Sequence, residues 1–381
     1  MASREDGTSL AALDGGLPSD HGVRTRMDAD FSTNASGATP SPLNGERAGV
    51  RGEKAPQASK LRLHLTKFQR WRVFIPLIAS LTASVNAADS FHFTNTTDKS
   101  IALFEGDRPV FVYNHGVIQP PAGVPADRAR SSYIHPLYGF DGEVLTDDFP
   151  KDHYHHRGLF WSWPHVRIGD KHYDLWMLKG IEHRFERWLA RETGTNDARL
   201  GVENGWYVGE RKVMQEQAWF RVAPSGKDER ALDVELNWTP VAEPLTLEGA
   251  EGKSYGGLTL RFAPRTNTVI TTPLGQGEKD LTITRLPWAD LSARFAGREQ
   301  ASGAAIFVAP DHPDYPPEWL TRHYGVLCLG WPGVKPKTFQ PGETNRCRYR
   351  VWIHRGAASV EKASQAYRAY EQALTVKREK N

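Results

Sequence analysis

Cysteine is scarce in this sequence, and signatures of several common enzyme classes are missing. Two cysteines in 381 residues exclude a disulfide-stapled scaffold and a zinc site built from four thiolates. No Gly-x-Gly-x-x-Gly fingerprint or phosphate loop follows a strand-like run, which disfavours nucleotide cofactors. No Gly-x-Ser-x-Gly motif supports a serine hydrolase. What remains is a chain with 39% hydrophobic and 10% aromatic residues, enough for a large folded core.

Excess charge is also missing from most of the chain. Residues 1–87 hold 11 of the 48 Lys and Arg residues and 8 of the 45 Asp and Glu residues, which accounts for the whole net charge of +3. The other residues carry 37 charges of each sign. A neutral folded part lacks the basic surface that phosphate backbones attract, so we expect no nucleic acid partner.

No apolar run reaches the 18 residues of a membrane span. The longest, residues 73–84, rises about 18 Å as a helix, against a bilayer core of roughly 30 Å. Basic residues precede this run and Ala87 follows it, which predicts a signal peptide over 67–87. We therefore expect a periplasmic or secreted mature chain without a stable membrane span.

The segment before the signal peptide has no apolar periodicity. Residues 1–66 are interpreted as a disordered leader, or as the product of a start codon assigned too early, the true one lying near Leu61. Residues 88–381 are predicted to form one domain.

Short bursts with a period of two dominate the mature chain. In 346–354 one face carries arginines and the other carries apolar residues, as in a half-buried strand. A single helix is predicted over 359–376, with Ser359 as its cap. The sequence predicts an all-β fold, a large antiparallel β-sandwich with one C-terminal helix.

The two cysteines leave two alternatives open. Cys328 and Cys347 both lie in strand-like runs that a Pro- and Gly-rich loop separates. If these runs form a symmetric hairpin, the two residues face each other and can form a disulfide in an oxidising compartment. Otherwise both are buried free thiols.

The stretch 153–163 concentrates the chemistry, with three histidines, an arginine and two tryptophans. On a strand His153 and His155 would share one face, a spacing that suits a divalent metal, with His135 or one of Asp147 and Asp148 as a third ligand. Without metal, His135, His153, His155 and His156 are candidates for acid–base catalysis or for structural roles.

Side chains near the histidines have paired interpretations. Arg157 can hold a carboxylate or form an ordinary ion pair. Trp161 and Trp163 share a strand face, which suits stacking on a sugar or burial in a sandwich core. Asp148 can be a catalytic carboxylate or a turn residue. Later substrate-binding candidates lie at loops rich in Gly or Pro: Tyr255, Arg261, Trp288, Asp290 and His312.

The run from Ser132 to Trp163, with Ile134-His135-Pro136, Asp147-Asp148 and His153-x-His155-His156-Arg157-Gly158, resembles an uncharacterised family of exported bacterial proteins. That family is often called PmoA-like, or methane oxygenase. Arg157 stands where a third consecutive histidine is expected, which argues against a tri-histidine metal site. The oxygenase label implies a multi-span membrane subunit, and this mature chain has no spanning helix, so we do not adopt that activity.

The late turn Gln340-Pro-Gly-Glu343-Thr is similar to the closing strands of galactose-mutarotase-like sugar enzymes. That resemblance implies a β-supersandwich with a carbohydrate site on its concave face. The leading hypothesis is an exported carbohydrate-active enzyme, of hydrolase, lyase or epimerase type. The alternatives are a non-catalytic sugar-binding or surface interaction protein and a metal-dependent oxidase or oxygenase.

Overall fold

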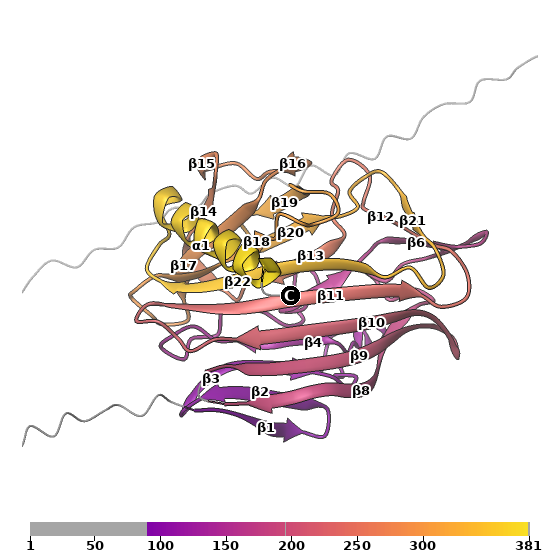
Figure 1. Cartoon of the computed structure of the whole chain (residues 1–381), viewed down its shortest axis with the longest axis horizontal. Coiled ribbons are helices and arrows are strands. Elements are labelled where there is room, and N and C mark those ends of the chain that lie inside the picture. The colour runs from indigo at the N-terminus through magenta and orange to yellow at the C-terminus, as the bar shows by residue number, and fades with distance from the viewer. Residues whose placement is uncertain (1–89, 195, 380–381) are drawn as a thin grey trace, which may run out of the picture. The chain divides into compact units, whose positions relative to one another are not determined.

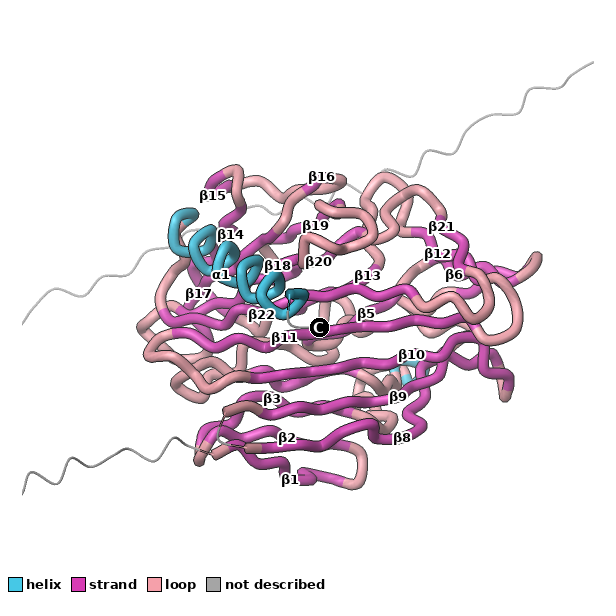
Figure 2. The backbone as a smooth tube through the Cα atoms, viewed as in Figure 1, coloured by secondary structure: helices cyan, strands magenta, loops and turns pink. Residues whose placement is uncertain are grey.

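Strands make up most of the folded chain, as the period-two pattern predicts (Figure 2). The computed structural model describes residues 90–194 and 196–379. The predicted leader and signal peptide, 1–66 and 67–87, lie outside the described residues. No described helix combines the length and the apolar character that crossing a bilayer requires.

Antiparallel strands form three sheets (Figure 1). Sheet 1 has nine strands, which are, in spatial order, β1 (Phe91–Thr97), β2 (Ser100–Glu105), β3 (Arg108–Asn114), β4 (Tyr133–Leu137), β5 (Leu159–Ser162), β13 (Gly257–Arg261), β20 (Val326–Gly330), β19 (Glu318–Arg322) and β16 (Thr284–Arg285). Sheet 2 has nine, which are β15 (Gly275–Gly277), β14 (Arg265–Thr272), β17 (Trp288–Phe295), β18 (Ser302–Val308), β22 (Asn345–Arg355), β11 (Glu229–Pro240), β10 (Arg211–Val222), β9 (Ala198–Val208) and β8 (Glu182–Thr193). A four-stranded sheet contains β21 (Lys337–Phe339), β12 (Leu245–Glu248), β6 (His165–Ile168) and β7 (Lys171–Tyr173).

One apolar core joins the two large sheets. Side chains of Leu103 and Trp161 from sheet 1 belong to the same buried cluster as Val234 and Val351 from sheet 2. Because successive strand residues point to opposite faces, each sheet keeps an outer face. This arrangement confirms the predicted all-β sandwich.

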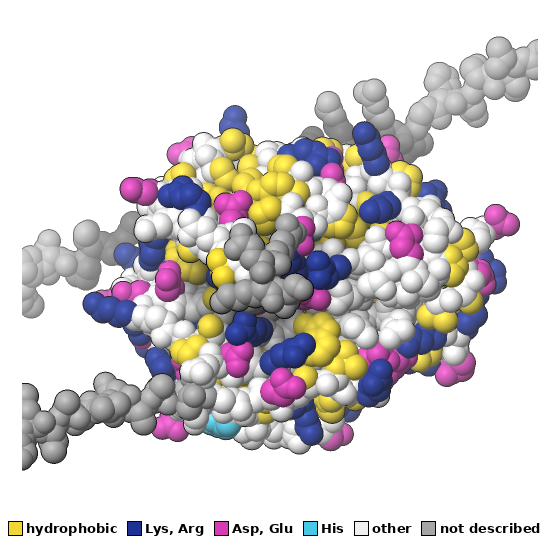
Figure 3. Space-filling model, viewed as in Figure 1, with side chains coloured by type: hydrophobic (Ala, Val, Ile, Leu, Met, Phe, Trp, Pro, Cys, Tyr) yellow, Lys and Arg dark blue, Asp and Glu magenta, His cyan; other side chains and the backbone are white. Residues whose placement is uncertain are grey.

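The predicted C-terminal helix is also confirmed, as α1 (Val360–Glu379). Ser359 caps it, since its Oγ accepts a hydrogen bond from the backbone N–H of Lys362 at 3.1 Å. The helix lies against sheet 2 (Figure 1), where Tyr367 and Tyr370 pack with Phe307 of β18 and Trp352 of β22. On the face drawn in Figure 3, acidic and basic side chains are interspersed, in keeping with the nearly neutral composition.

The expectation that the stretch 153–163 is a strand is wrong in part. Residues 153–158 lie in turns and loop, and only Leu159–Ser162 of that stretch is a strand, because Pro150 and the Lys151-Asp152 turn start a different backbone path. The histidines therefore lie on a loop, where their directions do not follow strand alternation.

The two cysteines are free and buried. Cys328 lies in β20 of sheet 1, and its thiol accepts a hydrogen bond from Thr259 Oγ1 at 3.1 Å. Cys347 lies in β22 of sheet 2. The hairpin that would bring them together does not form, because the two strands pair with different partners. Of the two alternatives, the structure has the pair of free thiols.

Candidate active site

A cavity of about 210 Å³ lies above the outer face of sheet 1. A small apolar cluster containing Phe160, Trp176 and Val326 forms the sheet surface beneath it. Turns and loops supply most of the rest. The lining residues are His153, His155, His156, Trp176, Met177, Lys253, Tyr255, Leu320, Arg322, Tyr324 and Val326.

Two consecutive turns present the three histidines to this cavity. The backbone N–H of His153 donates to Pro150 O at 2.9 Å, and that of His156 donates to His153 O at 2.8 Å. The rings of His153 and His156 stack in parallel with centroids 4.7 Å apart, and Tyr324 stacks on the other side of His153 at 5.3 Å. The His155 ring stands edge-on to His156 at 4.6 Å. The turns thus bring together three rings that a strand would have separated.

Burial controls the protonation of these rings. It lowers the pKa of His155 to about 3, with help from the charges of His153 and Arg130. Burial also holds the pKa of His156 well below its usual range, and His155 and His153 add to the effect. Both imidazoles are therefore neutral near pH 7, and a neutral imidazole can accept a proton.

The ring nitrogens of these two histidines are available. His156 Nδ1 is buried and has no hydrogen-bond partner in the described part of the chain. His155 is half-buried, and among the described residues its ring has aromatic neighbours but no hydrogen bond. Buried polar atoms usually have partners, so an unpartnered one at a cavity is a candidate for ligand contact.

Arg157 supports the histidine turn from below. It is fully buried, and its Nη1 donates to the backbone oxygens of Tyr154 at 2.8 Å and His156 at 2.6 Å. Its Nε lies 3.3 Å from Asp148 Oδ1, and its guanidinium lies over the Phe149 ring. Arg157 does not line the cavity, so its observed role is to fix the turn.

Gly158 and Asp148 lie next to Arg157, and each has a structural role there. Gly158 allows a close approach to β4, because a Cβ there would lie 2.2 Å from Ile134 O. Asp148 accepts a hydrogen bond from Tyr133 Oη at 2.9 Å, and burial raises its pKa to about 6 although Arg157 opposes the rise. Asp148, predicted as catalytic, is not a lining residue of the cavity.

Tyr255 reaches the cavity because two glycines follow it. Gly256 and Gly257 have φ of 142° and 133°, which L side chains rarely adopt. A Cβ on Gly257 would lie 2.9 Å from Leu329 O, so only glycine fits this close to β20. The Tyr255 ring packs on Trp176 with centroids 4.8 Å apart. Burial raises the pKa of Tyr255, so it keeps its proton and can donate it.

Sequence reasoning missed three lining residues that carry chemistry. Lys253 and Arg322 bring positive charge, and Tyr324 brings aromatic surface. Tyr324 lies in the turn between β19 and β20, under the guanidinium of Arg261 at 5.0 Å. The mixture of Tyr, Gly and His in residues 323–325 is the loop signal that could have drawn attention to it.

Arg261 lies beside the cavity. Its Nη2 donates to Asp152 Oδ1 at 2.7 Å, and the other oxygen of Asp152 lies 3.0 Å from His153 Nδ1. Arg261 therefore links β13 to the histidine turn through Asp152. It is 5% exposed and does not line the cavity.

Several predicted residues lie elsewhere. His135 bonds to Thr146 through Nδ1 at 3.1 Å and is not a lining residue; burial, with Arg157 nearby, lowers its pKa to about 4. Trp161 and Trp163 face the sandwich core, so they offer no stacking platform. Three more are buried away from the cavity: Trp288, Asp290 and His312.

The predicted metal ligands do not form a metal site. Among the described residues, no group of three or more His, Cys, Asp or Glu is placed to hold a metal ion. His153 and His155 meet at a ring distance of 5.6 Å, but His135 does not join them at the cavity. The expected trio of imidazoles is therefore replaced by His153, His155 and His156, which two consecutive turns bring together.

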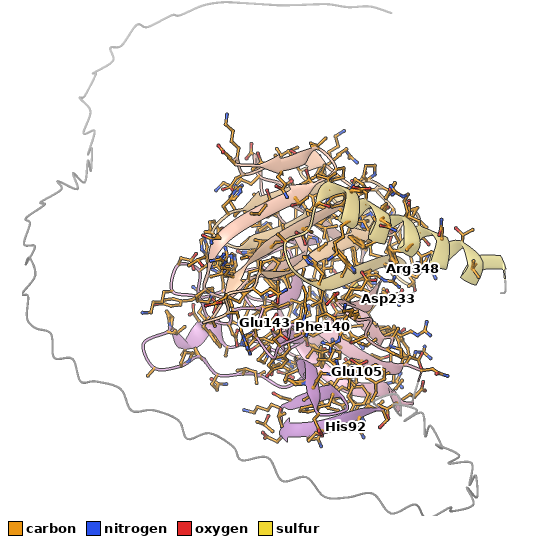
Figure 4. The ribbon with its side chains drawn as sticks, turned by 90° about the vertical axis from the view of Figure 1, so that its left-hand side faces the viewer. His92, Glu105, Phe140, Glu143, Asp233 and Arg348 are labelled. Carbon is orange, nitrogen blue, oxygen red and sulfur yellow. The ribbon has the colours of Figure 1, made fainter. Side chains whose placement is uncertain are left out.

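A larger groove, of about 560 Å³, lies on the outer face of sheet 2 beside α1. Asp233 and Arg348, labelled near the helix in Figure 4, line it. Its charged groups are engaged: Asp233 binds Arg350 at 2.6 Å, and Arg348 Nη2 donates to Asp311 at 2.5 Å. We therefore place the candidate active site at the smaller cavity, where polar atoms lack partners.

Comparison with protein families identifies the class to which the chain belongs. Residues 100–368 match a family of unknown function, DUF6807, and this protein is a member of that family. No curated protein matches the chain. The match contains the histidine turn and every lining residue of the cavity. The resemblance to PmoA-like proteins stays a prediction.

Solved structures with a similar arrangement are distant. A heparan sulfate lyase, HepC, from Pedobacter heparinus has 12% identity and a TM-score of 0.34, with 72% of this chain and 36% of that chain covered. The GH36 α-galactosidase AgaB from Geobacillus stearothermophilus has 11% identity and a TM-score of 0.35, with 71% of this chain and 40% of that chain covered. A galactose mutarotase related enzyme from Lactobacillus acidophilus has 7% identity and a TM-score of 0.32, with 71% of this chain and 99% of that chain covered. The chain thus spans less than half of the first two proteins, and at these TM-scores the likenesses carry no argument about function.

Proposed function

We propose that this protein is an exported carbohydrate-active enzyme that transfers protons on a sugar bound in the histidine cavity. The observation that carries the proposal is that a neutral imidazole without a hydrogen bond among the described residues, His155, lines the same cavity as a protonated phenol, Tyr255. Hydrolysis, elimination and epimerisation each need one group that takes a proton and another that gives one.

The cavity suits a small polar ligand with an apolar face. Its volume of about 210 Å³ is below the roughly 300–1,000 Å³ of pockets for drug-sized molecules, so it fits a single ring. Trp176, Leu320 and Val326 supply apolar surface. The hydrogen-bonding groups of His155 and Tyr255 lie around that surface and can bind hydroxyls. A sugar ring combines these two requirements.

Burial of the tryptophans weakens the alternative of a non-catalytic sugar-binding protein. That hypothesis depends on a stacking platform of Trp161 and Trp163. Both indole N–H groups are used inside the core, on Glu216 Oε2 at 2.7 Å and on Trp331 O at 2.6 Å.

His155→Gln tests the proposal. Full-length wild-type protein is incubated with a panel of mono- and oligosaccharides, and products are followed by NMR. We expect turnover of at least one sugar, with the rate lowered about 10²–10⁴-fold in His155→Gln, the range for loss of a general base. His92→Gln, an exposed substitution in β1, is the matched control and should leave the rate unchanged.

Two outcomes would contradict the proposal. A wild-type protein that binds sugars but changes none would favour the non-catalytic alternative. Equal turnover by His155→Gln and wild type would remove His155 from the chemistry, and with it the assigned site.

A further inference from the structure

The cavity wall has positive charge and no negative charge. Lys253 and Arg322 are among its 11 lining residues, and none of the 11 is Asp or Glu. Lys253 is exposed and forms no ion pair with any described residue. His155 and His156 are neutral near pH 7, so the positive charge of the wall comes from Lys253 and Arg322.

More positive charge lies behind the histidines. Arg128, Arg130 and Arg157 all act on the imidazole of His155. Arg130 is 4% exposed, and its Nη2 donates only to neutral oxygens, among them Ser162 Oγ at 2.8 Å. Its Nε and Nη1 have no hydrogen-bond partner among the described residues. No described carboxylate lies within ion-pair distance of Arg130, although the charge of Asp174 acts on it from further away. A buried cation that is not directly paired creates a field that favours a bound anion.

The nearby carboxylates are already engaged. Asp148 faces Arg157, and Asp152 is shared by Arg261 and His153. Asp280 lies 3.9 Å from Arg322 but 2.7 Å from His323 Nδ1.

Asp174, whose charge acts on Tyr255 and on Arg130, accepts a hydrogen bond from the Met177 N–H at 2.8 Å. With these groups counted, Lys253 is the lining cation that forms no ion pair with a described carboxylate.

We propose that the sugar bound in this cavity carries a carboxylate, as a uronic acid does, and that Lys253 and Arg322 face it. This inference rests on the proposed function. A single negative charge fits better than a phosphate, which carries about −1.5 to −2. Arg322 Nη1 already donates to the backbone oxygens of Leu281 and Thr321. The ammonium of Lys253 and the rest of the Arg322 guanidinium are therefore the groups that can bind the anion.

The loop that carries Lys253 has a defined conformation. The backbone N–H groups of Lys253 and Ser254 both donate to Ala250 O, at 3.1 and 2.7 Å. The Ala250 N–H donates to Tyr255 O at 2.9 Å, which closes the loop. The ammonium is therefore presented from the same short loop that places the proposed proton donor, Tyr255.

Binding of matched ligands tests the inference. Methyl glucuronoside, its neutral methyl ester and methyl glucoside are titrated into the full-length protein by calorimetry at low and high salt. We expect the acid to bind about tenfold more tightly than either neutral ligand, and to lose most of that advantage at high salt.

Lys253→Gln should weaken binding of the acid about tenfold without changing binding of the neutral ligands. Lys253→Arg should largely restore it. Lys227→Gln, in the turn between β10 and β11, is the matched control and should behave as wild type.

The outcomes separate this inference from the proposed function. Equal affinity for the acid and the neutral glycosides, with turnover that depends on His155, would contradict the proposal of a carboxylate-bearing sugar. The proposed enzymatic function would still stand. No binding of any of the three ligands, together with no turnover in the sugar panel, would overturn both. Tighter binding of glucose 6-phosphate than of methyl glucuronoside would show that the anion is a phosphate and would also overturn the inference.

Discussion

Two polar centres in this protein differ in how their buried groups are hydrogen-bonded. The first surrounds Glu216, which is fully buried between the sheets. Its Oε2 accepts hydrogen bonds from the indole N–H groups of Trp161, Trp206 and Trp238 at 2.7–3.0 Å, and its Oε1 accepts one from Asn204 at 2.9 Å. The second centre is the histidine cavity, where neither His156 Nδ1 nor the His155 ring has a hydrogen-bond partner in the described part of the chain.

The difference separates a structural centre from a candidate functional one. Every oxygen of Glu216 is used, so the carboxylate orients three tryptophans and has nothing left for a ligand. Charge and hydrogen bonds from its neighbours outweigh the desolvation that burial causes and lower its pKa to about 2. In the cavity, desolvation dominates and lowers the pKa of His155 to about 3. Among the described residues both centres contain buried atoms without a hydrogen-bond partner, Asn204 Oδ1 and His183 Nδ1 near Glu216 and His156 Nδ1 at the cavity, but His156 borders a space that a ligand can enter.

The strongest way to break the comparison is Glu216→Gln. One amide oxygen cannot accept three indole N–H bonds and the Asn204 bond, and the new N–H₂ would meet donors. We expect a loss of about 3–5 kcal/mol in the free energy of unfolding, as for breaking a buried charged pair. Urea denaturation measures it.

Glu192→Gln is the control for this substitution. Glu192 is exposed in β8, 3.9 Å from its ion-pair partner Arg199, so its loss should stay within about 0.5 kcal/mol. Equal, small effects of the two substitutions would mean that the indole N–H groups find other acceptors and that Glu216 is not a centre of the core.

The buried imidazoles and Glu216 should lose their contributions to the free energy of unfolding in different pH ranges. His155, His135 and His312, with pKa values lowered to about 3, 4 and 4, bind protons in the unfolded chain before the folded one, so their contribution falls as pH drops below 6.5. Glu216 contributes until pH falls below about 4.5. Asp148, with its pKa raised to about 6, works in the opposite direction between pH 6 and 3.8.

We expect the free energy of unfolding to fall by about 3 kcal/mol or more between pH 6.5 and 4.5, measured by denaturation at each pH. His312→Gln should make that fall shallower, because Gln does not titrate, and should leave the region below pH 4.5 unchanged. A flat profile from pH 6.5 to 4.5 would show that these imidazoles are solvated or paired in solution.

The sequence predicts those parts of the fold that repeat locally. In β22 the alternation of Arg348 and Arg350 with Tyr349 and Val351 identifies both faces, and the structure confirms it. For α1, Ser359 and the helical spacing of the apolar residues predict the start and the buried side. Each of these signals is complete within about 20 residues.

The site depends on information that a single sequence lacks. Trp161 and Trp163 share a face, as expected, but alternation does not say which face of a sheet lies inside. Lys253 and Tyr324 come from loops far from the histidines in the chain, and they reach the cavity because β13, β20 and β19 are neighbours in sheet 1. Strand order of this kind has no local signal.

The smallest expected effect on stability is that of replacing His155, and it tests directly whether the cavity is a structural centre. His155→Leu removes a half-buried ring without hydrogen bonds, so we expect the free energy of unfolding to change by less than about 1 kcal/mol, or to rise. The same substitution at His354 breaks a fully buried pair, in which His354 Nε2 lies 2.8 Å from Asp290 Oδ2, and should cost about 3–5 kcal/mol.

Thermal and urea denaturation of these two variants measure the contrast, and the sugar panel gives the functional readout for His155→Leu. A protein that keeps its stability but loses turnover would show that the imidazole is retained for chemistry. A loss of stability at His155 as large as that at His354 would instead make His155 a structural residue. In that case the distinction between a closed core centre and an open cavity would no longer locate the active site.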